Sequence, residues 1–188
     1  MIGVLASTPL ALAVTVTVAG ARNLALFAGA LRLTVGGVLL AVMVTVRAAL
    51  QALAQLPECH LLAASRLYRT PAWGNEDQPD FINAVVALDT ALAPLALLRQ
   101  LLAIEARHGR VRSVPNAPRT LDLDLLMHGD ATMAGAELTL PHPRMHERAF
   151  VLLPLLEIAP DVQLPGLGAA RSFLSAVAGQ AIERSEPM

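Results

Sequence analysis

The sequence predicts an α+β fold in which helices cover one face of an antiparallel β-sheet. Leucine and aspartate alternate strictly from Leu121 to Leu125, which is the period of two expected for a strand with one buried face. Apolar residues recur at helical spacing in two other stretches, one ending at Pro57 and one beginning at Pro94. Runs rich in β-branched and aromatic residues lie between turn-forming residues elsewhere in the chain, and these runs predict further strands.

The predicted elements come in the order β-α-β-β-α-β. They are a strand over 13–18, a helix ending at Pro57, strands over 60–68 and 81–89, a helix from Pro94 to Gly109, and the strand that contains Asp122 and Asp124. This order predicts a ferredoxin-like split βαβ arrangement, with both helices on one face and the loops and the two aspartates on the open face. The expected C-terminal additions are an edge strand over 137–140, a charged loop over 142–148, and helices over 150–158 and 169–177.

The composition indicates one domain without a general affinity for polyanions. The chain has 188 residues, enough for one hydrophobic core, and its formal net charge of −1 gives no reason to expect nucleic-acid binding. Lysine is absent, so the lysine of a phosphate-binding P-loop is excluded. Cys59 is the only cysteine, so no disulfide forms within the chain, and a cytoplasmic location is expected.

Residues 1–46 are unusually apolar and carry only two charged side chains, both arginine. A secretory signal is one interpretation, but Met1–Leu10 has no basic residue. A membrane helix is another, but Leu33–Val46 would span only about 21 Å, short of the hydrocarbon core of ~30 Å. The preferred interpretation is a soluble strand over 13–18, where valine and threonine alternate, followed by an irregular apolar insertion. A segment encoded out of frame would produce the same pattern.

Asp122 and Asp124 lie on the same side of their predicted strand, about 7 Å apart. Two carboxylates at this distance repel by ~2–3 kcal/mol at an effective dielectric of about 20, so their charge needs compensation. One or two Mg²⁺ ions would supply it, because Mg²⁺ prefers hard oxygen ligands. Arginines such as Arg119 are the alternative, and the strand alone does not decide between the two.

Several separate motifs mark the central part of the chain. They are Tyr68–Pro71, Asp77–Asn83, Glu105 with Gly109–Arg112, Asn116–Leu126, Leu140–His142, Arg148–Phe150 and Pro154–Pro160. Their order and spacing resemble the hydroxymethyldihydropterin pyrophosphokinase family over about residues 45–165. The resemblance implies a Mg²⁺-dependent transfer of diphosphate from ATP to the hydroxymethyl group of a reduced pterin, a step of folate synthesis that releases AMP.

The resemblance implies roles for residues on the nucleotide side. Asp122 and Asp124 would hold two Mg²⁺ ions on the phosphates of ATP, the co-substrate, and Arg110 and Arg112 would act with them in catalysis. The residues implied in ATP binding are Glu105, Arg110, Arg112, Arg119, Leu125, Thr139, His142 and Arg148. Arginine suits this role because the guanidinium stays charged and can bind phosphate oxygens bidentately.

The resemblance also implies a pterin pocket. Phe81 and Phe150 would hold the ring between their faces, and Asn83 would hydrogen-bond its amide edge. The residues implied in pterin binding are Thr70, Pro71, Trp73, Phe81, Asn83, Asp122 and Phe150. Aromatic faces hold flat heteroaromatic rings well. Four of the six aromatic residues of the chain lie in the motif regions that would form this pocket, namely Tyr68, Trp73, Phe81 and Phe150.

The first third of the chain departs from the family, because an extra apolar stretch follows the distorted turn at Gly20–Asn23. Two alternative functions therefore stay open. One is another two-metal nucleotidyl or phosphoryl transferase on a ferredoxin-like fold, and the other is a non-catalytic remnant that binds nucleotide. A zinc site at His142 and His146 is disfavoured, because Pro143 lies between them and no H-E-x-x-H motif is present. We expect small-molecule substrates, no nucleic-acid or membrane partner, and a monomer.

Overall fold

The computed structural model describes residues 10–19, 35–71, 80–109 and 121–184, and for residues 10–19 and 35–43 it describes the backbone alone. The turn predicted over 20–23 lies outside the described residues. So do four of the candidate site residues, Trp73, Arg110, Arg112 and Arg119.

An antiparallel sheet forms the centre of the molecule. Its strands are β1 (Leu10–Ala19), β2 (Cys59–Ala64), β3 (Tyr68–Thr70), β4 (Phe81–Thr90), β5 (Asp122–Leu125) and β10 (Glu183–Arg184). Their order is β10-β3-β4-β1-β5, and β2 pairs with the part of β4 beyond β3. Helix α1 (Val35–Ala54) connects β1 to β2, and helix α2 (Pro94–Arg107) lies between β4 and β5. This arrangement confirms the predicted ferredoxin-like α+β fold.

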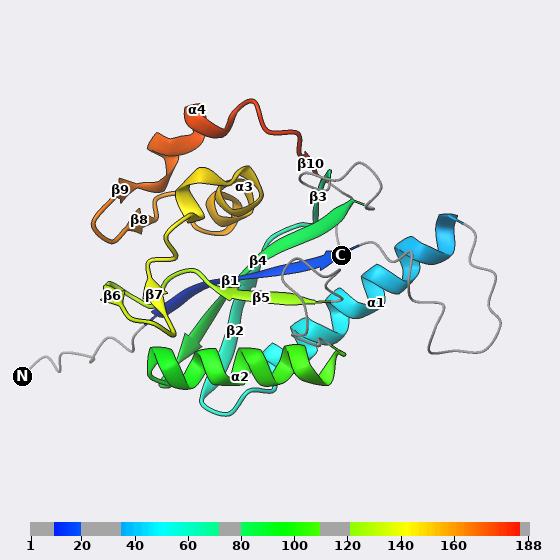
Figure 1. Cartoon of the computed structure of the whole chain (residues 1–188), viewed down its shortest axis with the longest axis horizontal. Coiled ribbons are helices and arrows are strands. Elements are labelled where there is room, and N and C mark those ends of the chain that lie inside the picture. The colour runs from blue at the N-terminus through cyan, green and yellow to red at the C-terminus, as the bar shows by residue number, and fades with distance from the viewer. Residues whose placement is uncertain (1–9, 20–34, 72–79, 110–120, 185–188) are drawn as a thin grey trace, which may run out of the picture.

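Helices lie on both faces of the sheet, as Figure 1 shows. Helices α1 and α2 share one core with the sheet, and α3 (Ala149–Ile158) forms a second core on the other face. The short elements that pack near α3 are η2 (Met145–Glu147), η3 (Ala170–Phe173) and α4 (Leu174–Val177). Strand β4 is buried between the layers, with Val86 in the first core and Val85 in the second.

The second face is therefore less open than the sequence predicted. Val85, Leu126 and Met127 place apolar side chains on it, and the C-terminal elements cover them. Burying this apolar area provides the reason why the C-terminal third packs here, since area removed from water stabilises at roughly 25 cal/mol per Å².

The predicted first strand is confirmed, and the helix after it is longer than predicted. Residues 13–18 lie within β1, which pairs with β4 along its length and with β5 at Val14–Thr17. Residues 35–44, predicted as irregular, form the first half of α1, so that prediction is wrong. The stretch contains no proline, and a helix already held by the buried Val46, Ala49 and Leu53 extends at low cost.

Among the residues whose side chains are described, the N-terminal end of α1 contributes little to the core. Val44 is 58% exposed, although its side chain is apolar. No helix in the described part of the chain is long and apolar enough to cross a membrane.

Three smaller predictions need correction. The strand predicted over 60–68 divides into β2 and β3, because Ser65 turns its hydroxyl to accept a hydrogen bond from the Val85 N–H (3.0 Å). The strand predicted over 137–140 is only β7 (Thr139–Leu140), which pairs with β6 (Met133–Ala134) instead of the central sheet. The helix predicted over 169–177 is η3 followed by α4, next to the small hairpin of β8 (Gln163–Leu164) and β9 (Gly168–Ala169).

Candidate active site

Strand β5 presents two carboxylates on one face of the sheet. Leu121, Leu123 and Leu125 are buried in the core shared with α1 and α2, whereas Asp122 and Asp124 are only partly buried. This confirms the alternation predicted from the sequence. The leucines also hold the strand in register, because a slip by one residue would turn both carboxylates into the apolar core.

A row of paired residues crosses the sheet from β3 to β5. Tyr68 pairs with Asn83, Asn83 pairs with Thr17, and Thr17 pairs with Asp122. Residues directly opposite each other on neighbouring strands share a face, so Asn83 and Asp122 project to the same side of the sheet. Two strand spacings, about 10 Å, separate their backbones. The fold thus brings a predicted pterin ligand close to a predicted metal ligand.

Asn83 is fixed by the strand next to it. It is 1% exposed, and its Nδ2 donates to Thr70 Oγ1 (3.1 Å) and to the Tyr68 carbonyl (3.4 Å). Phe81 lies two positions earlier on β4 and therefore on the same face, where it is partly buried. Pro71, directly after β3, is exposed.

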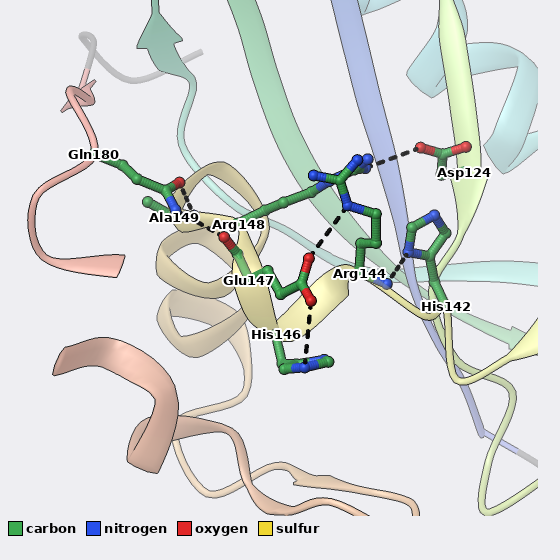
Figure 2. A network of polar contacts seen from close by, with 8 residues as sticks. All are labelled: Asp124, His142, Arg144, His146, Glu147, Arg148, Ala149 and Gln180. Atoms are coloured by element: carbon green, nitrogen blue, oxygen red, sulfur yellow. Dashed lines mark hydrogen bonds and ion pairs between the residues drawn. The ribbon is translucent and has the colours of Figure 1, made fainter. Parts of the chain in front are cut away.

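Arg148 brings a positive charge to the aspartates from the start of α3. Its Nη1 lies 4.0 Å from Asp124 Oδ2, and Figure 2 shows the side chain reaching from α3 toward that carboxylate. Burial lowers the pKa of Arg148, and attraction to Asp124 and Asp122 opposes this shift. The guanidinium remains a cation at neutral pH. Its Cζ also lies 5.5 Å from the ring centroid of Phe150. This cation–π contact joins a residue predicted to bind ATP to a residue predicted to bind the pterin.

His142 lies beside the same aspartate. Its backbone N–H donates to the Leu126 carbonyl (2.8 Å), and its Nδ1 accepts a hydrogen bond from the Arg144 N–H (3.2 Å), which Figure 2 also shows. Burial lowers the pKa of His142, while the charge of Asp124 acts in the opposite direction. With Nδ1 as an acceptor, the neutral ring carries its proton on Nε2 and can donate it to an anionic ligand.

Three further candidates lie away from this cluster. The side chain of Leu125 is buried in the core, so only its backbone is available to a ligand. Glu105 is 2% exposed, and its Oε1 accepts a hydrogen bond from the Leu123 N–H (2.7 Å). Thr139 is exposed on β7.

Two contacts that support the site were missed in the sequence. Gln180 holds the start of α3, since its Oε1 accepts from the Ala149 N–H (2.9 Å) and its Nε2 donates to the Glu147 carbonyl (2.7 Å; Figure 2). Glu157, near the end of α3, accepts a hydrogen bond from the Tyr68 hydroxyl (2.8 Å). No local pattern signals either contact, because the partners are 31 to 89 residues apart in the chain.

Comparison with known proteins identifies the family of this chain. Residues 32–160 match the family model described as 7,8-dihydro-6-hydroxymethylpterin-pyrophosphokinase (HPPK). The chain belongs to this family. The resemblance of the sequence motifs is thereby confirmed, and the matched range begins near the start of α1.

Relatives with this name are similar over most of their length. A 2-amino-4-hydroxy-6-hydroxymethyldihydropteridine pyrophosphokinase of Pseudomonas aeruginosa is 48% identical over 139 residues, which cover 74% of this chain and 86% of the relative. The enzyme of the same name from Haemophilus influenzae is 48% identical over 118 residues, or 63% of this chain and 74% of the relative.

A solved structure supports the fold. Plasmodium falciparum HPPK-DHPS with pteroate superposes with a TM-score of 0.61 over 89% of this chain, at 14% identity. This chain covers 42% of that longer protein. At such low identity the likeness concerns the fold alone.

Proposed function

We propose that this protein transfers diphosphate from ATP to the hydroxymethyl group of 6-hydroxymethyl-7,8-dihydropterin, giving AMP and the pterin diphosphate in folate synthesis. Family membership supports the reaction class. The row that places Asn83 and Asp122 on one face of the sheet supports the assignment of the site, because it sets an amide that would bind the ring about 10 Å from a carboxylate that would bind the metal.

In the proposed reaction the hydroxymethyl oxygen of the pterin attacks the β-phosphorus of ATP. The bond between this phosphorus and the oxygen that bridges it to the α-phosphorus breaks, AMP leaves with that oxygen, and the hydroxyl proton is released. Such a transfer requires mainly alignment of the two substrates and neutralisation of charge.

The aspartate pair suits two Mg²⁺ ions. In the described part of the chain no group of three or more His, Cys, Asp or Glu side chains is placed to hold a metal. Asp122 and Asp124, which share the partly exposed face of β5, would supply the protein ligands, and phosphate oxygens and water would complete the coordination. When bound, the ions neutralise charge on the transferred diphosphate.

The remaining residues then have separable roles. Arg148 and His142 would bind phosphate oxygens beside Asp124, together with Arg110, Arg112 and Arg119. Glu105, Leu125 and Thr139 would complete the nucleotide side, Leu125 by its backbone.

On the other side of the site, Phe81 and Phe150 would stack on the pterin ring and Asn83 would bind its amide edge. Thr70, Pro71 and Trp73 would border the pocket. We also propose that residues 1–188 act as one monomeric domain on small-molecule substrates alone.

The alternatives differ in what they require of the fold. A non-catalytic remnant requires a first strand that does not complete the sheet, yet β1 pairs with both β4 and β5, which argues against this alternative. Another two-metal transferase would release pyrophosphate after nucleotidyl transfer or ADP after phosphoryl transfer, instead of AMP, so product analysis separates the alternatives.

Asparagine substitutions test the proposal. Asp122→Asn and Asp124→Asn should each reduce turnover at least ~10²-fold, because they remove metal-binding charge at the phosphates. Asp130→Asn, at an exposed position, is the matched control and should keep wild-type turnover. Products are separated by chromatography after incubation with ATP, Mg²⁺ and the reduced pterin. Near-normal turnover in either variant, or pyrophosphate as the product, would contradict the assignment.

A further inference from the structure

Glu105 is a buried carboxylate on the last full turn of α2. It lies on the face of the helix that also carries the buried Leu97, Leu101 and Ile104. Burying a carboxylate in apolar surroundings is costly unless its hydrogen bonds are made. Leucine would fill this position at lower cost, so packing alone does not explain the residue.

The contact made by Glu105 gives the explanation. Its Oε1 accepts a hydrogen bond of 2.7 Å from the backbone N–H of Leu123, and both groups are buried. Strand β5 is the last strand in the described sheet, with β1 on one side only. An N–H that points away from β1 therefore needs a partner from outside the sheet, because an unpaired buried N–H costs about 1–3 kcal/mol.

Leu123 is also the residue between the two aspartates. A hydrogen bond to its amide restrains the peptide that joins Asp122 to Leu123, and so the relative direction of the two carboxylates. Metal sites depend strongly on such outer contacts, which orient the ligands without touching the metal.

We propose that Glu105 is a positioning residue of the metal site, which acts through the Leu123 amide on Asp122 and Asp124. This inference rests on the proposed function, since it assumes that the two aspartates bind Mg²⁺. It goes beyond the proposed place of Glu105 on the nucleotide side, because it rests on the buried hydrogen bond between Glu105 Oε1 and β5.

Two substitutions distinguish the loss of the hydrogen-bond acceptor at position 105 from the loss of its negative charge. Glu105→Gln keeps an oxygen that can accept the Leu123 N–H, whereas Glu105→Leu keeps the volume and removes the acceptor. Leu97→Ala is the matched control, because Leu97 is fully buried on the same helix without a bond to β5. It should lower stability and leave the metal site intact.

The first measurement uses Mn²⁺ as a probe of the metal site, titrated by electron paramagnetic resonance in the presence of α,β-methylene-ATP. Glu105→Leu should raise the Kd of Mn²⁺ by roughly 10-fold or more, as outer-contact variants of metal sites do. Glu105→Gln and Leu97→Ala should stay close to wild type. Binding of the same analogue in EDTA measures the nucleotide contact of Glu105 separately, so the Kd of Mn²⁺ is determined at saturating analogue for each variant.

The second measurement is independent of substrates and of activity. In ¹H–¹⁵N spectra the Leu123 amide should exchange slowly with solvent in the wild type and in Glu105→Gln, and rapidly in Glu105→Leu. If Glu105→Leu fails to fold, slow exchange in the wild type and in Glu105→Gln remains the required result.

Three outcomes would overturn the proposal. They are rapid exchange of the Leu123 amide in the wild type, an equal loss of Mn²⁺ affinity in the Gln and Leu variants, and an unchanged Kd of Mn²⁺ in Glu105→Leu. Failure of the proposed function would appear differently, as a wild-type protein that forms no pterin diphosphate although its Leu123 amide is protected.

Discussion

Tyr68→Phe should destabilise the protein by loosening the contact between β3 and the end of α3. The Tyr68 hydroxyl, on a residue that is 6% exposed, donates to Glu157 Oε2 at 2.8 Å. The same carboxylate accepts from the Arg66 N–H (3.3 Å) and lies 3.6 Å from Arg66 Nε. These contacts fix the strand that carries Thr70 against the helix that carries Phe150.

The expected loss of stability follows from the chemistry of the two hydrogen-bond partners, Tyr68 and Glu157. A hydrogen bond to a charged acceptor contributes about 1.5–3 kcal/mol, and we expect about 1–2 here because part of the Glu157 side chain is exposed. The Arg66 ion pair is exposed and adds at most ~1 kcal/mol. For a domain of this size, Tyr68→Phe should thus lower the Tm by about 2–8 °C.

The pH dependence of stability above pH 10 provides a second test of this contact. Burial, followed by the hydrogen bond to Glu157, raises the pKa of Tyr68 to about 12. The unfolded chain releases this proton near pH 10, so the folded state holds more protons between pH 10 and 12. The contribution of Tyr68 is complete below pH 10 and is lost as the pH rises toward 12. Tyr68→Phe should lack this part of the decline.

Urea unfolding of the wild type, Tyr68→Phe, Glu157→Gln and the double variant gives the coupling energy of the pair, which we expect to be about 1 kcal/mol or more. A parallel series from pH 8 to 12 tests the titration. A coupling energy near zero, together with identical alkaline profiles for the wild type and Tyr68→Phe, would refute this reasoning.

Two further predictions concern the ends of the site. Phe150→Ala should weaken pterin binding far more than ATP binding in calorimetric titrations, because the ring that stacks on the pterin is lost. Phe173→Ala, in the same core, should affect neither, and equal weakening for both ligands would make Phe150 merely structural. Removal of residues 24–38, upstream of the buried face of α1, should raise solubility and retain activity. Unfolding of that variant would show that these residues belong to the core.

The sequence determined those features that depend on neighbouring residues. The alternation around Asp122 and Asp124 predicted the strand, its buried face and the shared side of the carboxylates, because side chains on a strand alternate regardless of what surrounds it. The helical spacing of apolar residues located α2, and the order and spacing of the separate sequence motifs identified the family. The order of these elements then left few topologies for the sheet, since short connections and a fixed crossover hand exclude most of them.

Only the tertiary structure decided which distant groups meet. The hydrogen bond from the Leu123 N–H to Glu105 joins the end of α2 to the edge of β5, and the sequence did not predict this contact. The contacts of Tyr68 with Glu157 and of Gln180 with Ala149 join segments that no periodicity connects. The start of α1 at Val35 was likewise beyond local reasoning, because the packing of its C-terminal half against the sheet, and not the apolar sequence before it, holds the helix in place.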